Sequence, residues 1–480
     1  LERYQQTLSH VLIDEYQDTN KAQYVLSKLL SAPQNNLYVV GDFSQSIYAW
    51  RGADYRNMLN LTTDFPTIQE YRLEQNYRSS QTILDAATNV ISQNTSHPIL
   101  QLWTENTDQE PIVIYEADSG EDEARKVVEY IKTKNLSHSY ADQVILYRTN
   151  AQSRAFEEAF IRNRIPYRIV GGVKFYARRE VKDVLSYLRL FINPNDSVSL
   201  ERATKLGKRK LDAFLNWKNS TLAELAKNDI TNVQDVLPLA ALQKILEVTQ
   251  YTDKYNPKDP EDLSRLENVQ ELLSVASQFQ QIDTFLENIA LIQDETMSDV
   301  TAEGKQDVIT LMSLHSAKGL EFPIVYMVGM EEGLFPHWRS IMDKEQMEEE
   351  RRLAYVGITR AKERLYITYA RRRLVYGSIT NAMPSRFLHD IPDHLVKKES
   401  ASFTRSANFG GYGSGYDQAP NKWKERFDDD VDHEEDRYGL KALNSRLSKI
   451  GSQRRFVPLD DSALDDVLSG DVDIEAFLKK

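Results

Sequence analysis

HVLIDEYQD, at residues 10–18, is the stretch of sequence that decides the fold. Its apolar run, 11–13, predicts a short strand that leads directly into a cluster of carboxylates. Open α/β sheets bind their ligands at the carboxyl ends of the strands, so Asp14 and Glu15 are expected at such an edge. A carboxylate there can hold Mg²⁺ through its waters, and a second one can orient and deprotonate a water molecule. We therefore assign Asp14 to a metal and Glu15 to the water, against the alternative of a solvated acidic turn.

Helix and strand signals alternate after this motif, as in half of a parallel sheet. Acidic, turn-rich residues 104–111 break the alternation, so a domain boundary is expected there. The predicted elements are a helix at 22–30, strands at 37–40 and 68–73, and a helix at 79–91 whose N-cap is Ser79 or Ser80.

A second α/β unit follows the boundary and is interrupted by a helical segment. Residues 198–300 show helical periodicity with hardly a strand-like run and little glycine, as expected of an all-helical insertion. The strand signals that resume after it imply that one sheet is interrupted and completed later in the chain. The predicted strands are 112–115, 144–147, 308–311, 324–328 and 365–369, and the predicted helices are 121–131, 151–161 and 345–357.

Length and composition exclude several classes of protein. A chain of 480 residues exceeds one ordinary core, so two or three domains are expected. Hydrophobic residues at 41% and charged residues at 27% are typical of a soluble globular protein, and no apolar run approaches the roughly 18 residues of a membrane span. The absence of cysteine excludes disulfides, thiol nucleophiles and thiolate zinc sites. Because no secretory leader is visible, a cytoplasmic location is expected.

The charge and the two ends of the sequence carry further expectations. A net charge of −13 argues against a uniformly basic nucleic-acid surface, so any nucleic-acid site must be local. Leu1 opens the sequence and no turn or cap precedes the first strand, so a truncated chain is expected. Residues 400–440 combine Gly, Ser, Asn and Tyr with the acidic block 428–436, which predicts a disordered linker. Apolar residues scattered among the acidic residues of 464–478 leave two alternatives, a solvated tail or a docking peptide for a protein partner.

Five motifs occur in an order that is very specific. They are DEYQDTN at 14–20, VVGDFSQSIYAWRGAD at 39–54, LEQNYRSS at 73–80, LHSAKGLEF at 314–322 and EEERRLAYVGITRAKE at 348–363. These motifs resemble the motor motifs of superfamily 1 DNA helicases of the UvrD/Rep/PcrA type, over roughly residues 1–398. The resemblance implies an α/β fold with two RecA-like parallel-sheet motor domains, the first incomplete, an all-helical insertion in the second and a disordered C-terminal tail. The expected domains are 1–103 for the first motor domain, 104–197 and 301–398 for the two parts of the second, 198–300 for the insertion and 399–480 for an acidic tail.

For the chemistry, the resemblance implies ATP and Mg²⁺ as cofactors. It makes Gln45 the residue that touches the γ-phosphate, and an amide suits this task because it can donate to phosphate and accept from water at once. Arg360 resembles an arginine finger of the second motor domain, whose guanidinium would neutralise charge on the transferred phosphoryl group. ATP would thus pull the two domains together, and hydrolysis would release them. The further nucleotide contacts are Tyr77 on the adenine, Arg78 on the γ-phosphate and Glu321 on the ribose.

For the partner, the resemblance implies single-stranded DNA and junctions between single and double strands. Trp50 resembles the family's base-stacking residue, and an aromatic face stacks on any base for roughly 1–3 kcal/mol. Its neighbours Tyr48 and Arg51 belong to the same expected contact. The other expected DNA contacts are His315, Ser316 and Lys318 on one loop, Asn150, Lys174 and Phe175 in two segments that resemble single-strand surfaces, and Tyr376. Core-directed aromatic residues and solvated polar loops are the alternatives.

The sequence departs from the family pattern because no GxxxxGK[ST] occurs in its 480 residues. In the family that loop lies upstream of the DEYQD strand and holds the β- and γ-phosphates. The polypeptide as given is therefore not expected to hydrolyse ATP at a useful rate. Three interpretations stay open: a fragment of a 3′ to 5′ DNA helicase of repair or replication restart, the helicase part of a helicase-nuclease subunit, and a non-catalytic DNA-binding or interaction module derived from a helicase.

Overall fold

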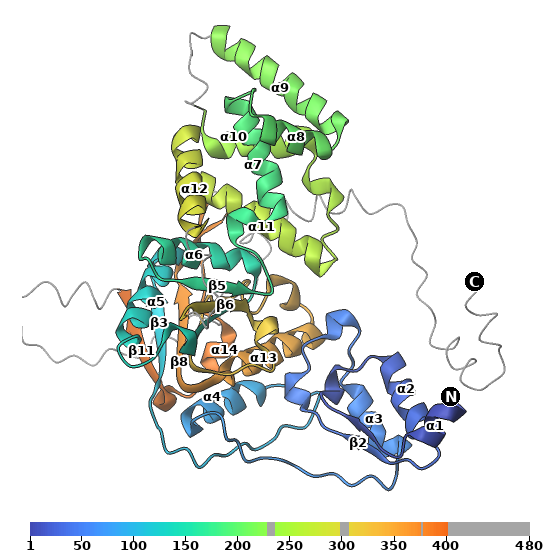
Figure 1. The fold of residues 1–480 in the computed structure, drawn as a ribbon. Helices are drawn as coiled ribbons and strands as arrows, with labels where there is room; N and C mark the ends of the chain where they lie inside the picture. Colours follow the sequence, from blue (N-terminus) through green and yellow to red (C-terminus); the bar gives the residue numbers. More distant parts are fainter. Residues whose placement is uncertain (228–235, 298–306, 376–377, 402–480) are drawn as a thin grey trace, which may run out of the picture. The chain divides into compact units, whose positions relative to one another are not determined.

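The computed structural model describes residues 1–227, 236–297, 307–375 and 378–401 (Figure 1). These residues lie in one compact unit, Leu1–Phe409. The predictions for Tyr376, for the linker and for nearly all of the acidic tail lie outside the described residues. Within the described ranges, no helix is both long and apolar enough to cross a membrane.

The segment that decides the fold forms a small parallel sheet. Strand β1 (Val11–Ile13) pairs with β2 (Leu37–Val39) in parallel, with Val11 opposite Leu37. Helix α2 (Lys21–Ser31) makes the crossover and starts at Asn20, whose side chain accepts from the backbone N–H of Gln23 at 2.9 Å. The predicted strands and the helix between them are confirmed. The helices α1 (Glu2–Thr7) and α3 (Arg56–Asp64) complete this part.

The strand predicted at 68–73 is wrong. The chain there forms no strand, and Tyr71 and Leu73 are 81% and 76% exposed. An apolar run becomes a strand only where a neighbouring strand supplies hydrogen bonds and a core covers one face. The next prediction holds, because helix α4 (Gln81–Ile91) begins after the N-cap residue Ser80.

A second sheet has seven strands in the order β11-β3-β8-β7-β4-β6-β5, and every neighbouring pair is parallel. Strands from before and after the helical segment interleave, since β4 lies between β7 and β6. The prediction of one interrupted sheet is therefore confirmed. The strands are β3 (Ile112–Ala117), β4 (Gln143–Tyr147), β5 (Tyr167–Val170), β6 (Ile309–Ser313), β7 (Phe322–Met327), β8 (Ala361–Ala370) and β11 (Val396–Ser400).

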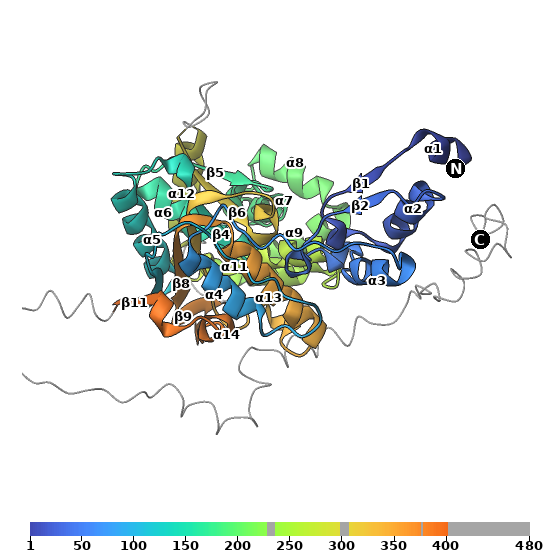
Figure 2. The ribbon, with the colours of Figure 1, turned by 90° about the horizontal axis from the view of Figure 1, so that it is seen from below.

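Helices cover both faces of this sheet (Figures 1 and 2). Alternate residues of β4 show the division, because Val144 packs in one core and Ile145 in the other. The first core contains α4 and α13 (Lys344–Ile358), and the second contains α5 (Gly120–Lys134) and α6 (Ser153–Arg162). Because α4 packs against α13, the segment that carries the first motor motifs is attached directly to the large sheet.

The helical segment has a core of its own, which also includes α7 from the preceding segment. Its members are α7 (Arg179–Ile192), α8 (Ser197–Lys205), α9 (Lys208–Lys227), α10 (Pro238–Thr249), α11 (Pro260–Ala276) and α12 (Ile282–Met297). After β8, the strands β9 (Arg372–Val375) and β10 (Ser378–Asn381) pair antiparallel, and α14 (Arg386–His389) precedes β11. The α/β fold with a large parallel sheet and a helical segment agrees with the prediction, while the proposed domain limits stay predictions.

Candidate functional site

Asp14 and Glu15 follow the carboxyl end of β1, where the sequence placed them. Both side chains are exposed, and Glu15 adopts a left-handed conformation with φ +52°. The backbone N–H of Glu15 donates to Oδ1 of Asp14 at 2.8 Å. This tight turn directs two carboxylates away from the strand, as a water-mediated metal site at a phosphate group requires.

The Glu15 carboxylate is in contact with a residue that lies far along the sequence. The ammonium group of Lys318 lies 3.3 Å from its Oε2 and also pairs with Asp18. The same oxygen accepts from Nε2 of Gln17 at 2.6 Å. Burial raises the pKa of Asp18, and the contact with Lys318 opposes this rise. The DEYQD turn and the loop around Lys318 therefore form one charged cluster.

Gln45 lies beside this cluster, in a short 3₁₀ turn, Phe43–Gln45. Its Nε2 donates to Oδ2 of Asp42 at 2.9 Å, and its backbone carbonyl accepts from Nζ of Lys318 at 2.8 Å. The structure thus brings the predicted water-activating carboxylate and the predicted phosphate contact together on one lysine.

A second cluster joins Arg78 to Glu321. Nε of Arg78 donates to Oε2 of Glu321 at 2.7 Å, and Nζ of Lys362 lies 2.6 Å from Oε1. The hydrogen bonds from Lys362 and Arg78 lower the pKa of Glu321 to about 2. Tyr77 next to this cluster is 85% exposed, so its ring is accessible for stacking on a base.

Arg360 is buried at the end of α13 and is 1% exposed. Its guanidinium donates to the carbonyl oxygens of Val356 and Leu320, both at 3.0 Å, and to Oγ1 of Thr359 at 3.1 Å. Burial and the nearby Arg78 lower the pKa of Arg360 to about 10. In this arrangement its guanidinium is held by α13, by Thr359 after that helix and by the loop before β7, so a role as an arginine finger requires the side chain to turn toward the nucleotide. That role stays a prediction.

The predicted DNA contacts after Gln45 form an exposed strip of aromatic and cationic groups. Tyr48 and Trp50 meet edge to face with ring centroids 6.5 Å apart, and the guanidinium of Arg51 lies 4.3 Å from the Trp50 ring. Trp50 is 46% exposed. The hydroxyl of Tyr48 donates to the backbone carbonyl of His315 at 3.1 Å, so this strip adjoins the second predicted DNA loop.

His315 and Ser316 lie in that loop, Leu314–Ala317, directly after β6. Burial, with the positive charges of Arg148 and Arg51, lowers the pKa of His315 to about 3, so its imidazole is neutral at physiological pH. Oγ of Ser316 lies 3.0 Å from the place where a Cβ on Gly171 would stand. The loop after β5 therefore approaches the His315 loop closely, and Gly171, with φ +75°, permits this approach.

Two residues that were predicted to contact DNA have buried side chains in this structure, and their roles in DNA binding stay predictions. The ring of Phe175 is fully buried in the core of the helical segment, where a base cannot reach it. The side chain of Lys318 is 6% exposed, and its ammonium contacts Asp18, Glu15 and the backbone carbonyl of Gln45.

Asn150 and Lys174 are half-buried. Nδ2 of Asn150 donates to Oγ of Ser264 on α11 at 3.3 Å, and Nζ of Lys174 lies 5.0 Å from the Tyr167 ring. Their roles in DNA binding stay predictions.

Three residues that the sequence analysis left without a role also join these segments. Oε1 of Glu349 accepts from the backbone N–H of Ala49 at 3.1 Å, and Nε of Arg352 donates to the carbonyl of Ser46 at 2.8 Å. Gln17 orients Glu15, as described above. Glu349 and Arg352 are three positions apart and therefore share a face of α13, which is the sequence signal that could have found them.

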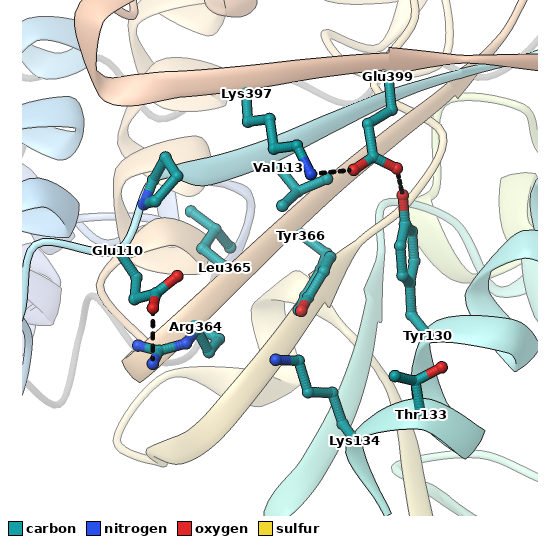
Figure 3. Close-up of a pocket in the computed structure, with 11 residues that line it drawn as sticks. Glu110, Val113, Tyr130, Thr133, Lys134, Arg364, Leu365, Tyr366, Lys397 and Glu399 are labelled. Atoms are coloured by element: carbon teal, nitrogen blue, oxygen red, sulfur yellow. Dashed lines mark hydrogen bonds and ion pairs between the residues drawn. The ribbon is translucent and has the colours of Figure 1, made fainter. Parts of the chain in front are cut away.

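A cavity of about 280 Å³ lies elsewhere, among β3, β8, β11 and α5 (Figure 3). None of the predicted site residues lines it. Its charged groups are largely paired, since Arg364 contacts Glu110 at 3.6 Å and Lys397 contacts Glu399 at 2.9 Å. The candidate site is therefore the group of contacts between the DEYQD turn, the Gln45 segment and the loops after β6, and not this cavity.

Comparisons with known proteins show the family of the chain. A model of the UvrD/REP helicase N-terminal domain matches residues 1–66, and a model of the UvrD-like helicase C-terminal domain matches 71–237 and 230–372. The chain belongs to the UvrD-like helicase family. This UvrD-like chain is 43% identical over 440 residues to the ATP-dependent DNA helicase PcrA of Staphylococcus aureus, a match that covers 84% of the chain and 60% of the relative. PcrA of Staphylococcus epidermidis is 44% identical over 435 residues, with 82% and 60% covered.

Membership of the UvrD-like family confirms the resemblance drawn from the five motifs. The matches place residues 1–66 in the family's N-terminal helicase domain. The UvrD-like chain spans about 60% of the length of these PcrA relatives. Among the residues that the structure describes, no three His, Asp or Glu side chains cluster to hold a metal by themselves, so Mg²⁺ at Asp14 would need phosphate oxygens and waters to complete its shell.

Proposed function

We propose that this chain is the motor part of an ATP-dependent DNA helicase that moves along single-stranded DNA and unwinds duplexes. The observation that carries the proposal is the set of contacts around Lys318, which join the predicted catalytic carboxylate Glu15 to the loop beside the exposed aromatic strip. In a translocase, nucleotide chemistry and the grip on DNA must be mechanically coupled. Here single hydrogen bonds join the two sets of residues: Lys318 donates to the carbonyl of Gln45, and Tyr48 donates to the carbonyl of His315.

In the nucleotide site, Asp14 would hold Mg²⁺ through waters and Glu15 would orient the attacking water. Gln45 and Arg78 would contact the γ-phosphate, Tyr77 would stack on the adenine and Glu321 would contact the ribose. Mg²⁺, when bound, would neutralise charge on the phosphate oxygens. Closure by ATP would draw Arg360 out of its contacts with Val356 and Leu320 and toward the phosphates.

In the DNA site, the exposed ring of Trp50 would stack on successive bases, with Tyr48, Arg51 and the His315 loop beside it. Stacking does not discriminate among bases, so the grip would be independent of sequence. We also propose the organisation into two RecA-like motor domains with a helical insertion at 198–300. Translocation from 3′ to 5′, a place in repair or replication restart, and a protein partner for the acidic tail belong to the same proposal and rest on the family resemblance.

Hydrolysis requires a phosphate-binding loop, and no GxxxxGK[ST] is present in the 480 residues. We therefore propose that the isolated chain binds single-stranded DNA but does not turn over ATP at a useful rate. Release of phosphate that rises when oligo-dT is added to the isolated chain would contradict this part of the proposal.

DNA binding is tested by fluorescence anisotropy of labelled oligo-dT titrated with the 480-residue chain. Arg51→Ala is expected to weaken binding, because it removes a cation that lies over the Trp50 ring. Arg56→Ala is the matched control, since Arg56 is an exposed arginine at the start of α3 that pairs with Asp54 and was not predicted to contact DNA. The proposal fails if oligo-dT does not bind, or if the two substitutions weaken binding equally.

A further inference from the structure

The cavity drawn in Figure 3 lies at the other edge of the second sheet from the candidate site. Its lining includes Glu110 and Pro111, just before β3, and residues in the first half of β8, whereas the His315 loop follows the carboxyl end of β6. Because every neighbouring pair of strands in this sheet is parallel, the two places are at opposite edges. The cavity is therefore separate from the residues that carry the proposed function.

Aromatic rings form a fixed wall of the cavity. The ring centroids of Tyr130 and Tyr366 lie 4.8 Å apart with 36° between the ring planes, and Tyr366 also stacks on Tyr326 at 5.0 Å and 24°. Tyr366 is 5% exposed and its neighbour Leu365 is 2% exposed, so both are held by the packing of the sheet. A rigid aromatic and apolar wall is the part of a pocket that receives the ring of a ligand.

Two of the three cations that line the cavity have carboxylate partners. Nη1 of Arg364 donates to Oδ2 of Asp108 at 2.6 Å, and Nζ of Lys397 lies 2.9 Å from Oε1 of Glu399. Lys134 is half-buried, and its ammonium has no ion pair or hydrogen bond among the residues that the structure describes. An ammonium group that is partly removed from water and lacks a counter-charge favours the binding of an anion.

The hydroxyl of Tyr366 supplies a second donor. Figure 3 shows the Lys134 ammonium and the Tyr366 hydroxyl directed toward the same part of the cavity. Within the described ranges of the chain, this hydroxyl has no hydrogen-bond partner. Burial raises the pKa of Tyr366 to about 12, so the hydroxyl keeps its proton at physiological pH and can donate. A carboxylate has two acceptor oxygens and can accept from both groups at once.

Volume and charge limit the ligand. Pockets for drug-sized molecules measure about 300–1,000 Å³, so a cavity of about 280 Å³ suits a smaller molecule, such as one ring with a short substituent. Three cations and two carboxylates line the cavity, which leaves one positive charge; they are Lys134, Arg364, Lys397, Glu110 and Glu399. A monoanion matches this excess, whereas a phosphate dianion would exceed it and would face the two carboxylates.

We propose that this cavity is a second binding site of the chain, which takes a small aromatic monocarboxylate. The carboxylate of the ligand lies between the Lys134 ammonium and the Tyr366 hydroxyl. Its ring lies on the wall formed by Tyr130, Tyr366 and Leu365. The site does not rest on the proposed function, because none of its lining residues belongs to the five motifs.

The test titrates phenylacetate into the 480-residue chain and follows binding by saturation-transfer NMR. Ordinary ligand efficiencies give a molecule of roughly ten non-hydrogen atoms a Kd on the order of 1 mM. Phenylacetamide has the same shape without the charge. It is expected to bind at least about tenfold more weakly, because hydrogen bonds to a charged group are stronger than those to a neutral one.

Four variants locate the binding. Lys134→Met should weaken phenylacetate binding at least about tenfold, and Lys134→Arg should keep it, because the cation is retained. Tyr366→Phe keeps the ring and removes only the hydroxyl, so binding should weaken by about 2- to 12-fold. Lys132→Met is the matched control and should bind as the wild-type chain does, because it removes an exposed lysine of the same helix, whose Nζ donates to Oδ1 of Asn163 at 2.8 Å.

The comparison of phenylacetate with phenylacetamide uses the wild-type chain, so it decides the question even if a variant does not fold. Binding that is lost in Lys134→Met and kept in Lys132→Met supports the site. The inference is overturned if phenylacetate does not bind at about ten times the expected Kd, if phenylacetamide binds equally well, or if Lys134→Met binds as the wild-type chain does. A wild-type chain that binds phenylacetate but not oligo-dT would contradict the proposed function and leave this site in place.

Discussion

The two aromatic residues Phe175 and Trp50 should respond in opposite ways to truncation. Phe175→Ala removes a ring that is fully buried, lies 5.1 Å from the Tyr176 ring and has the Arg178 guanidinium 5.2 Å away. Truncation of a buried phenylalanine costs about 3–5 kcal/mol, because the cavity is only partly refilled. We expect a loss of stability of this size and no weakening of DNA binding by the molecules that remain folded.

Trp50→Ala removes a ring that is 46% exposed, so its cost in stability should stay below about 1 kcal/mol. The lost stacking should weaken the affinity for oligo-dT by about 5- to 150-fold, which corresponds to roughly 1–3 kcal/mol. Trp103→Ala is the matched control, because Trp103 is 47% exposed and lies outside the aromatic strip.

Urea unfolding followed by circular dichroism gives the stability, and anisotropy of labelled oligo-dT without urea gives the affinity. The reasoning is refuted if Phe175→Ala leaves the unfolding midpoint unchanged and weakens DNA binding as much as Trp50→Ala. It is also refuted if Trp103→Ala weakens binding as much as Trp50→Ala, because general exposure of aromatic rings would then explain the effect.

Three further predictions concern charged groups. The pKa of His315 is lowered to about 3 from an ordinary value of 6.5, so as the pH decreases the imidazole is protonated in the unfolded chain before it is protonated in the folded chain. The stability of the fold should therefore fall between about pH 6.5 and pH 3. His315→Gln should flatten that part of a pH–stability curve measured by thermal unfolding. The pKa of Glu321 is lowered to about 2 from 4.5, so its contribution is present above pH 4.5 and lost as the pH falls toward 2; solvent screens this half-exposed group, so Glu321→Gln should change acid unfolding only slightly. Glu350→Gln leaves the guanidinium of Arg148, now 2.6 Å from Oε1, without its counter-charge and should cost about 3–5 kcal/mol in urea unfolding, whereas Glu201→Gln, at an exposed pair, should cost little.

Local patterns predicted the elements that carry the motifs. The apolar run 11–13 before two carboxylates gave β1 and its turn correctly, because an apolar strand that ends in polar residues is a signal contained in a few neighbouring positions. The run 68–73 has similar residues but no described strand pairs with it, and pairing is a tertiary property. The reverse error concerns β11, whose sequence VKKES is polar because it lies at the edge of the sheet and pairs with β3 alone.

In the candidate site, too, features set by the local sequence could be predicted and features set by tertiary contacts could not. Asp14, Glu15 and Gln45 could be proposed as site residues from the sequence because their motifs are contiguous. The partners of Lys318 were not, since Asp18 lies 300 positions away in the sequence and only the folded chain brings the two together. The burial of Phe175 could not be predicted, because an aromatic residue in a basic segment has the same local signature whether its ring faces DNA or a core. The orientation of Arg360 likewise depends on carbonyl groups that no motif encodes.

The small sheet of β1 and β2 has a consequence for the behaviour of the protein in concentrated solution. Within the described residues, each strand has one neighbour, so both outer edges present unpaired N–H and C=O groups. Leu12 and Tyr38 add an apolar surface there, since they are 71% and 60% exposed. Unprotected edges with apolar side chains are templates for pairing with another molecule. We therefore expect this patch to favour association of the chain in concentrated solution, against the repulsion from its net charge of −13.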